Sequence, residues 1–379
     1  MDDVTPPPKR LAELVRLFGT LGVIAFGGPA AHIAMMHKEV VGRRRWTTDQ
    51  DFIDLIGVTN LIPGPNSTEM TMHVGRIRAG WRGLIVAGAS FIIPAALIVL
   101  ACAIAYVEYG QTPNGQAVLY GIKPVVLAII GQALARLGRV ALTTDVLQWL
   151  VAVAALAAYL LGANEILVLA AGALVVLGWR SIRTVNGPAV IVPVLLAVDG
   201  QQSLGLGQIF AVFLKIGAVL YGSGYVLLAF LRTDLVTGLG VLTNQQLLDA
   251  IAIGQFTPGP LFTTATFIGY LLGGLPGAAV ATIGIFLPAF CFVAAIGPFV
   301  ERLRNRTWTA ALLDGVNAAA LGLMAGVTLV LASDAVVDPL TAALLVATAV
   351  LLWRTSLNSA WLVLGGAAIG LAGSLVGVV

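Results

Sequence analysis

DFIDLIGVTNLIPGPNSTEM at residues 51–70 decides the fold, and a second copy of its pattern, QLLDAIAIGQFTPGPLFTTA, stands at residues 246–265. In each copy a Pro-Gly-Pro motif separates two short apolar stretches. Proline removes a backbone donor and disfavours helix at the residue before it, and glycine adds conformational freedom. The motif therefore predicts, twice in the chain, a corner where one short helix ends and another begins.

The two corners belong to a longer internal repeat. The two Pro-Gly-Pro motifs are 195 positions apart, and the same separation aligns GVIAFGGPA at 22–30 with GAVLYGSGY at 217–225. It also aligns Glu39 with Asp234 and Asp54 with Asp249. One residue is then lost, and the separation of 194 positions aligns further glycines and a proline: Gly75 with Gly269, Gly80 with Gly274, Gly83 with Gly277, and Pro94 with Pro288. Repeats of this length are interpreted as a duplication. We expect an N-terminal repeat over residues 1–186 and a C-terminal repeat over residues 187–379.

The composition restricts the class of protein. Hydrophobic residues make up 59% of the 379 residues and charged residues only 10%, against about 25% in soluble domains. This excludes a soluble globular enzyme, a disordered chain and a nucleic-acid-binding domain. The 44 glycines suit close packing of membrane helices. The two cysteines and three histidines have no metal-ligand spacing, so we expect neither metal nor cofactor.

Hydropathy predicts an all-α polytopic membrane protein. A span takes about 20 residues, so the chain holds about ten full spans plus a broken, re-entrant helix hairpin at each Pro-Gly-Pro motif. Each half is expected to cross the membrane about five times. Because this number is odd, the second copy is inverted relative to the first, and the basic loops of both halves then lie on one side of the membrane. Lys9, Arg10 and Arg16 disagree unless the first helix breaks at Gly27-Gly28-Pro29 or begins in the interface. Residues 188–198 form an apolar piece that has no counterpart in this scheme.

Broken helices in an inverted repeat indicate a transport site near the midplane. Irregular backbone in a membrane protein lines a cavity or is buried by protein. The helix starting after each second proline offers free N–H groups and a partial positive charge to an anion. The candidate substrate-binding residues are Gly27, Gly28, Gly64, Asn66, Ser67, Thr68, Lys215, Gly222, Ser223, Gly259, Thr263 and Thr264. The alternatives are turns between ordinary helices with hydroxyl caps, and glycines that only allow close packing.

Five acids are candidates for coupling or gating: Glu39, Asp54, Glu69, Asp234 and Asp249. Four of them pair between the repeats and lie at ends of apolar runs, where helix capping or pairing with arginine is the alternative. Glu69 has no acidic counterpart, lies beside the predicted anion site and is a candidate proton carrier. The GxxxG pairs Gly322/Gly326 and Gly366/Gly370 indicate either helix packing or a homodimer face.

Several long motifs resemble the chromate ion transporter family. They are FGGPAAHIAMMHKEVV at 26–41, DFIDLIGVTNLIPGPNSTEM at 51–70, RAGWRG at 78–83, FIIPA at 91–95, GQFTPGPLFTTATFIGYLLGG at 254–274 and IFLPAF at 285–290. The chain resembles the long form, in which two homologous halves are fused. The resemblance implies a multi-pass protein of the cell inner membrane that exports chromate from the cytoplasm and confers chromate resistance. Family members usually carry Gln at the position of Glu69, so this chain departs from the pattern there.

The charge of the substrate favours export. Moving one charge through 100 mV is worth about 2.3 kcal/mol, and a dianion therefore gains roughly 4.6 kcal/mol on leaving a cell that is negative inside. Membrane potential, proton exchange or both suffice as the driving force. A transporter of sulfate or a related oxyanion and an anion channel remain alternatives. The hypothesis of a membrane-embedded enzyme has no motif to support it, because the sequence contains no H-E-x-x-H, G-x-S-x-G or Walker A motif. The expected partners are the oxyanion and the lipid bilayer, with no nucleic acid.

Overall fold

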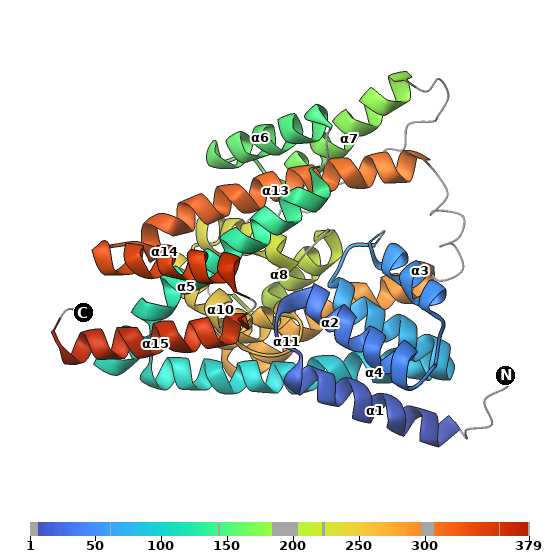
Figure 1. Ribbon diagram of the computed structural model, residues 1–379, viewed down its shortest axis with the longest axis horizontal. Helices are drawn as coiled ribbons and strands as arrows, with labels where there is room; N and C mark the ends of the chain where they lie inside the picture. Colours follow the sequence, from blue (N-terminus) through green and yellow to red (C-terminus); the bar gives the residue numbers. More distant parts are fainter. Residues whose placement is uncertain are drawn as a thin grey trace.

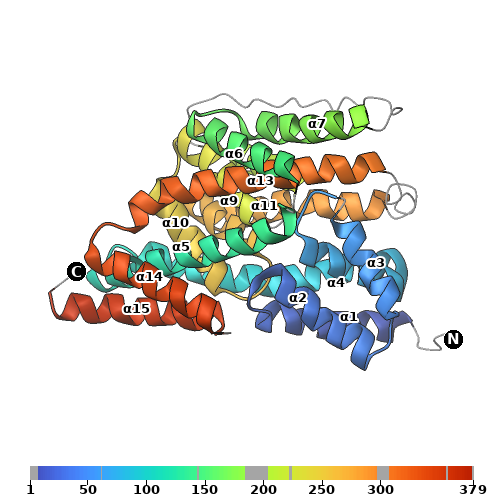
Figure 2. The same ribbon diagram turned by 45° about the horizontal axis from the view of Figure 1, so that its top comes forward.

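The computed structural model describes residues 7–60, 62–142, 145–183, 204–221, 224–296, 307–355 and 357–377, and the regular structure in these ranges is helical. In chain order the elements are α1 (Pro7–Ile24), α2 (Gly28–His37), the π-helix η1 (Lys38–Arg43), α3 (Asp49–Thr59), α4 (Asn66–Tyr109), α5 (Pro113–Ala141), α6 (Val146–Leu160), α7 (Glu165–Arg183), α8 (Leu206–Val219), the 3₁₀-helix η2 (Gly224–Val226), α9 (Leu227–Leu231), the π-helix η3 (Arg232–Gly238), α10 (Asn244–Phe256), the 3₁₀-helix η4 (Leu261–Thr263), α11 (Thr264–Ile296), α13 (Thr307–Ala335), α14 (Pro339–Arg354) and α15 (Ser359–Leu375). They form a bundle with α1–α3 at one end and α14–α15 toward the other (Figures 1 and 2).

The first helix is broken where the glycines predict it. Gly27 and Gly28 have φ of 101° and 80°, a region that glycine enters without a Cβ penalty, and they separate α1 from α2. Glu13 near the start of α1 bonds to Arg78, and Arg44 just after η1 lies with Arg78 against the Trp46 ring. Both ends of this pair of segments therefore lie at one end of the molecule. The structure therefore contains the break that the sequence offered as one explanation for the basic N-terminal residues.

α4 is two antiparallel arms rather than one rod. Ala79 and Gly80 leave helical geometry, and Gly80 has φ 61° and ψ −147°, which a residue with a Cβ rarely adopts. A Cβ built on Gly75 would lie 2.2 Å from the carbonyl oxygen of Gly83. In a straight helix these two glycines, eight residues apart, would be separated by about 12 Å. Their contact therefore shows that the chain reverses direction at residues 79–80.

α11 repeats this hairpin. Gly273 and Gly274 break it with nearly the same angles, φ 60° and ψ −150° at Gly274. A Cβ on Gly269 would lie 2.4 Å from the carbonyl oxygen of Gly277, and the hydroxyls of Thr266 and Thr282 are 2.7 Å apart across the arms. In each case a short arm starts at a Pro-Gly-Pro corner and a longer arm returns.

The helices are apolar enough for a membrane. Within the part of the chain that the structure describes, four segments could cross it by length and composition: Asn66–Tyr109, Pro113–Ala141, Leu261–Ala295 and Ala310–Ala335. Ile85, Ile93 and Leu97 of α4 are each more than half exposed, as lipid-facing side chains are. The chain is thus an all-α polytopic membrane protein, and the count of about ten spans stays a prediction.

Glycine pairs hold helices together inside the chain. Gly366 and Gly370 of α15 contact the backbone of Gly121 and Ala117 in α5, since an added Cβ would approach those carbonyl oxygens to 2.6 and 2.0 Å. The other GxxxG pair packs against α6: Gly322 lies on the carbonyl oxygen of Ala152 and Gly326 on the Tyr159 side chain. Both pairs therefore serve intramolecular packing, and the homodimer stays a prediction.

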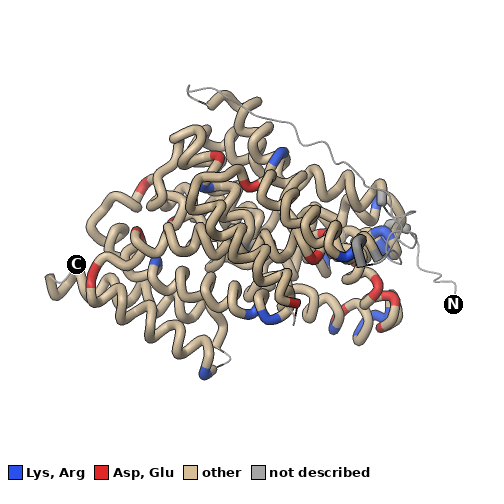
Figure 3. Tube along the Cα trace, turned by 90° about the horizontal axis from the view of Figure 1, so that it is seen from above, with Lys and Arg blue, Asp and Glu red and all other residues tan. Residues whose placement is uncertain are grey.

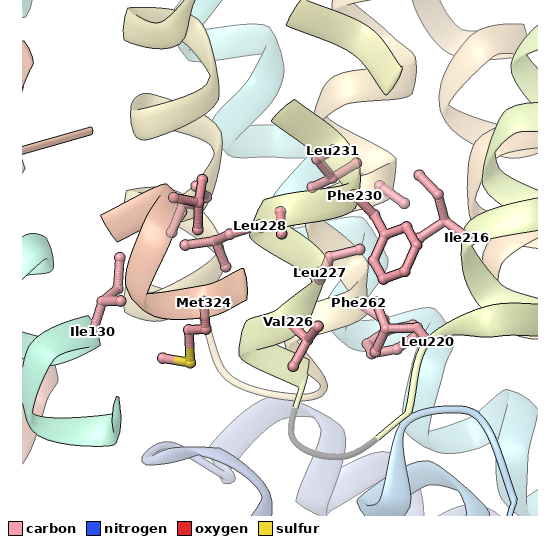
Figure 4. Close-up of a cluster of buried hydrophobic side chains, with 14 of the residues drawn as sticks. Ile130, Ile216, Leu220, Val226, Leu227, Leu228, Phe230, Leu231, Phe262 and Met324 are labelled. Carbon is pink, nitrogen blue, oxygen red and sulfur yellow. The ribbon is translucent and has the colours of Figure 1, made fainter. Parts of the chain in front are cut away.

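The broken segment of the second half lies in the hydrophobic core. Figure 4 shows Val226, Leu227 and Phe230 between α8, η4 and α13, with Leu220 beside Phe262. These side chains are buried. The short helices η2 and α9 are thus surrounded by protein.

Many Lys and Arg positions lie at the end of the molecule that carries α1–α3 (Figure 3). Arg76 donates to the carbonyl oxygens of Val293 and Ala294, at 3.0 and 3.2 Å, in the last turn of α11. The bonds satisfy carbonyls that a helix end leaves open. They also place the break of α4 beside the far end of α11.

A carboxylate cap starts α14. Asp338 accepts hydrogen bonds from the Tyr120 hydroxyl at 2.5 Å and from the backbone N–H of Thr341 at 2.8 Å. These bonds, first that from Tyr120, hold the pKa of Asp338 below its usual range. The cap ties α14 to α5.

Candidate functional site

The two Pro-Gly-Pro corners exchange hydrogen bonds with the opposite half. Gly64 N–H donates to the carbonyl oxygen of Leu220 at 2.8 Å, and Gly259 N–H donates to that of Ala25 at 2.9 Å. Ala25 and Leu220 are themselves equivalent positions, just after α1 and α8. Each corner of one half therefore satisfies the open carbonyl of the other half's first helix. Both corners lie where the two halves meet.

Glycine is required at both corners. Gly64 has φ 140° and Gly259 has φ 92°. A Cβ on Gly259 would lie 2.3 Å from Cβ of Ala95 in α4, and one on Gly64 would lie 3.4 Å from Cβ of Ala289 in α11. The two alanines are again equivalent positions, so the packing between halves is reciprocal, as in a contact with two-fold symmetry.

A helix begins without a cap after each corner. Pro65 precedes α4 and Pro260 precedes η4, and neither has a side chain that can accept a hydrogen bond. Thr68 N–H bonds back to Pro65 and Thr263 N–H to Pro260, which leaves the N–H groups before them without an intrahelical partner. Buried helix starts of this kind suit an anion.

Two of the predicted hydroxyl groups, those of Ser67 and Thr263, already donate hydrogen bonds to acceptors within the protein. His32 Nε2 lies 3.0 Å from the carbonyl oxygen of Ala25, and its Nδ1 lies 3.3 Å from Ser67 Oγ. A carbonyl oxygen only accepts, so Nε2 carries the proton of the neutral ring and Ser67 donates to Nδ1. Thr263 donates to the Pro260 carbonyl oxygen at 2.8 Å. Their oxygens remain acceptors.

Buried polar groups beside the corners lack hydrogen-bond partners among the described residues. The hydroxyl oxygens of Thr68 and Thr264 have none, and neither carboxylate oxygen of Glu69 has one. Glu69 is fully buried, and a Cβ on Gly64 would lie 2.2 Å from its Oε1. The carboxylate thus lies directly against the first corner. Asn66 donates its amide N–H to Asn60 at 2.6 Å, while its own Oδ1 is buried without a partner in the described ranges.

The other predicted residues lie farther along the elements. Gly27 and Gly28 form the break before α2, while Gly222 and Ser223 lie outside the described residues. Lys215 forms an ion pair with Asp234 at 2.5 Å, so its charge has a protein partner. The locations of these residues do not test whether they bind an anion or gate transport, so both roles stay predictions.

The remaining acids are paired in different ways. Glu39 binds Arg43 at 2.6 Å on its own π-helix, and Asp54 accepts from Gln50 at 3.2 Å on α3. Asp249, the counterpart of Asp54, is buried between two other helices. It accepts from Tyr106 of α4 at 2.9 Å and pairs with Lys123 of α5 at 3.3 Å. The equivalent helices α3 and α10 therefore make different contacts through these two acids.

Sequence reasoning missed His32 and Lys123. Lys123 lies in an apolar run directly before Pro124, the same signal that singled out Lys215. It borders an open cavity of about 500 Å³ together with Tyr106, Gln245 and Asp249. His32 carries no such signal, since only the fold brings it beside Ser67. A second cavity of about 500 Å³ borders the second corner at Thr257 and Pro258.

These features define a polytopic helical membrane protein whose helix breaks are buried between its two halves. The family described as chromate transporter matches residues 12–177 and again residues 207–371, and the chain belongs to this family. The family points to a transporter of an oxyanion rather than to an enzyme.

Curated relatives cover nearly the whole chain. The chromate transport protein of Cupriavidus metallidurans is 36% identical over 97% of this chain and 94% of its own length. That of Pseudomonas aeruginosa is 34% identical over 99% and 94%, and the probable chromate transport protein of Synechococcus elongatus is 32% identical over 88% and 87%. No solved structure matches this fold.

Proposed function

We propose that this chain is a secondary transporter that exports chromate from the cytoplasm across the inner membrane and confers chromate resistance. Membrane potential, proton exchange or both drive it. The names of the relatives support chromate as the substrate. The observation that carries the proposal is the reciprocal exchange between corners, because it holds two uncapped helix starts between the halves of the molecule.

Alternating access follows if the halves are an inverted repeat of residues 1–186 and 187–379. The antiparallel course of equivalent helices supports the inversion. Arg76, at the break of α4, lies beside Val293 near the end of α11, and Tyr106 near the end of α4 packs on Phe267 in the first arm of α11. The returning arms therefore run in opposite directions. Rocking of one half against the other would open the site to each side in turn.

A flux measurement tests the function. Inside-out vesicles containing the full chain are loaded by external chromate, with sulfate as competitor, while pH and membrane potential are set separately. We expect accumulation that rises when the lumen is made positive, because a dianion is drawn inward there. Absence of chromate flux under every gradient, with folded protein present, contradicts the proposal.

Sulfate or a related oxyanion is the second candidate, because it shares the tetrahedral shape and double charge that a helix start recognises. Sulfate flux that exceeds chromate flux in the same vesicles would select it. Unitary currents at ion-channel rates in planar bilayers would select an anion channel instead.

A further inference from the structure

The first corner contains hydrogen-bond acceptors that lack donors. Glu69 is fully buried, and both of its carboxylate oxygens lack a partner among the described residues. An unpaired buried carboxylate is costly, because desolvation is not repaid by any bond. The group needs a proton or a donor from a ligand.

Two neighbouring side chains strengthen this acceptor character. Ser67 donates its hydroxyl proton to His32, which leaves its oxygen to accept. Thr68 Oγ1, one residue before Glu69, is fully buried and has no partner in the described ranges. The backbone N–H groups before Thr68, at the start of α4, have no intrahelical partner and can donate at this corner. The first corner therefore holds both backbone donors and a carboxylate acceptor.

The second corner lacks the carboxylate. Thr263 and Thr264 stand where the first corner has Glu69, and Thr263 already donates to the Pro260 carbonyl oxygen. The acidic character is thus a property of one corner of this chain and not of the repeat.

We propose that Glu69 selects oxyanions by their affinity for a proton, so that chromate binds with one proton held between a chromate oxygen and the Glu69 carboxylate. This inference rests on the proposed function, because it assigns specificity to the same site. Hydrogen chromate loses its proton near neutral pH, whereas hydrogen sulfate is a much stronger acid and keeps its proton only in strongly acidic solution. Chromate therefore shares a proton with a carboxylate readily, whereas sulfate is too weak a base to hold much of that proton. A site built to bond a substrate hydroxyl rejects analogues that lack it.

Selenate separates proton affinity from size. It matches chromate closely in shape and dimensions but is as weak a base as sulfate. The unmodified protein should therefore bind chromate far better than selenate, and sulfate should resemble selenate. Equal competition by selenate and chromate would overturn the inference without any variant.

Glu69→Gln is the decisive variant, because its amide donates to any oxyanion oxygen. We expect the preference for chromate over selenate to narrow by roughly 10- to 100-fold, the range for losing a hydrogen bond to a charged group. Glu108→Gln, the same change at an exposed position of α4, is the matched control and should keep the full preference. A folded Glu69→Gln protein with an unchanged preference would overturn the role of Glu69.

Two readouts distinguish this inference from the proposed function. The first is competition for labelled chromate flux in proteoliposomes, and the second is thermal stabilisation of the purified full chain by each anion at one fixed pH. Selective stabilisation by chromate without any flux would leave the specificity standing and refute transport. Flux of chromate with no preference over selenate would leave transport standing and refute the specificity.

Discussion

Gly259→Ala tests the packing of one half's corner against the other half. Gly259 has φ 92°, and an added Cβ would lie 2.3 Å from Cβ of Ala95. The backbone conformation costs about 1–2 kcal/mol for a residue with a Cβ. Overpacking against Ala95 adds about 1–3 kcal/mol. The free energy of unfolding should therefore fall by about 2–5 kcal/mol.

Ala95→Gly separates the two causes, because it removes the atom that the new methyl would meet. The double variant should be more stable than the sum of the single effects by about 1–3 kcal/mol, the steric part alone. Gly240→Ala is the matched control: its φ is 62° but nothing lies within 4 Å of an added Cβ. It should cost about 1–2 kcal/mol and show no coupling to Ala95→Gly.

Unfolding by SDS in mixed micelles measures each of these free energies. Additivity of Gly259→Ala and Ala95→Gly within about 0.5 kcal/mol would refute the reasoning, since residues that do not touch add in this way. The second corner would then not pack on α4, and the shared site between the halves would lose its structural basis.

Three further predictions concern buried contacts and one helix cap. His32→Leu should destabilise the fold by about 1–3 kcal/mol because it leaves Ser67 without its acceptor, and His32→Gln by less; equal losses in micelle unfolding would argue against the ring's hydrogen bonds. Lys215→Met should cost about 3–5 kcal/mol by stranding Asp234, and adding Asp234→Asn should recover much of it; a double variant as unstable as the single one contradicts the pairing. Asp338→Ala should cost about 1 kcal/mol at neutral pH. The pKa of Asp338 is below its usual range, so this contribution is complete above about pH 5 and is lost as the pH falls through the folded-state pKa; a pH-independent difference between the two proteins would refute it.

The helix breaks could be predicted because they depend on local backbone chemistry. Proline cannot donate and glycine tolerates positive φ, so the corners at Gly64 and Gly259 and the break at Gly27 follow from residue type alone. The reversals at Gly80 and Gly274 were not foreseen in detail, although the short apolar runs end near them. Their glycines also adopt conformations that only glycine enters easily.

The sequence by itself determined the membrane class, the internal repeat pattern and the positions of the corners, because composition, spacing and the special backbones of proline and glycine are properties of short stretches. Only the tertiary structure decided which groups face each other across those corners. It gave Lys215 to Asp234, placed His32 between Ser67 and Ala25, and left Glu69 without a partner in the described chain. These pairings join residues from different helices, so they depend on how the helices pack and not on any spacing along the chain.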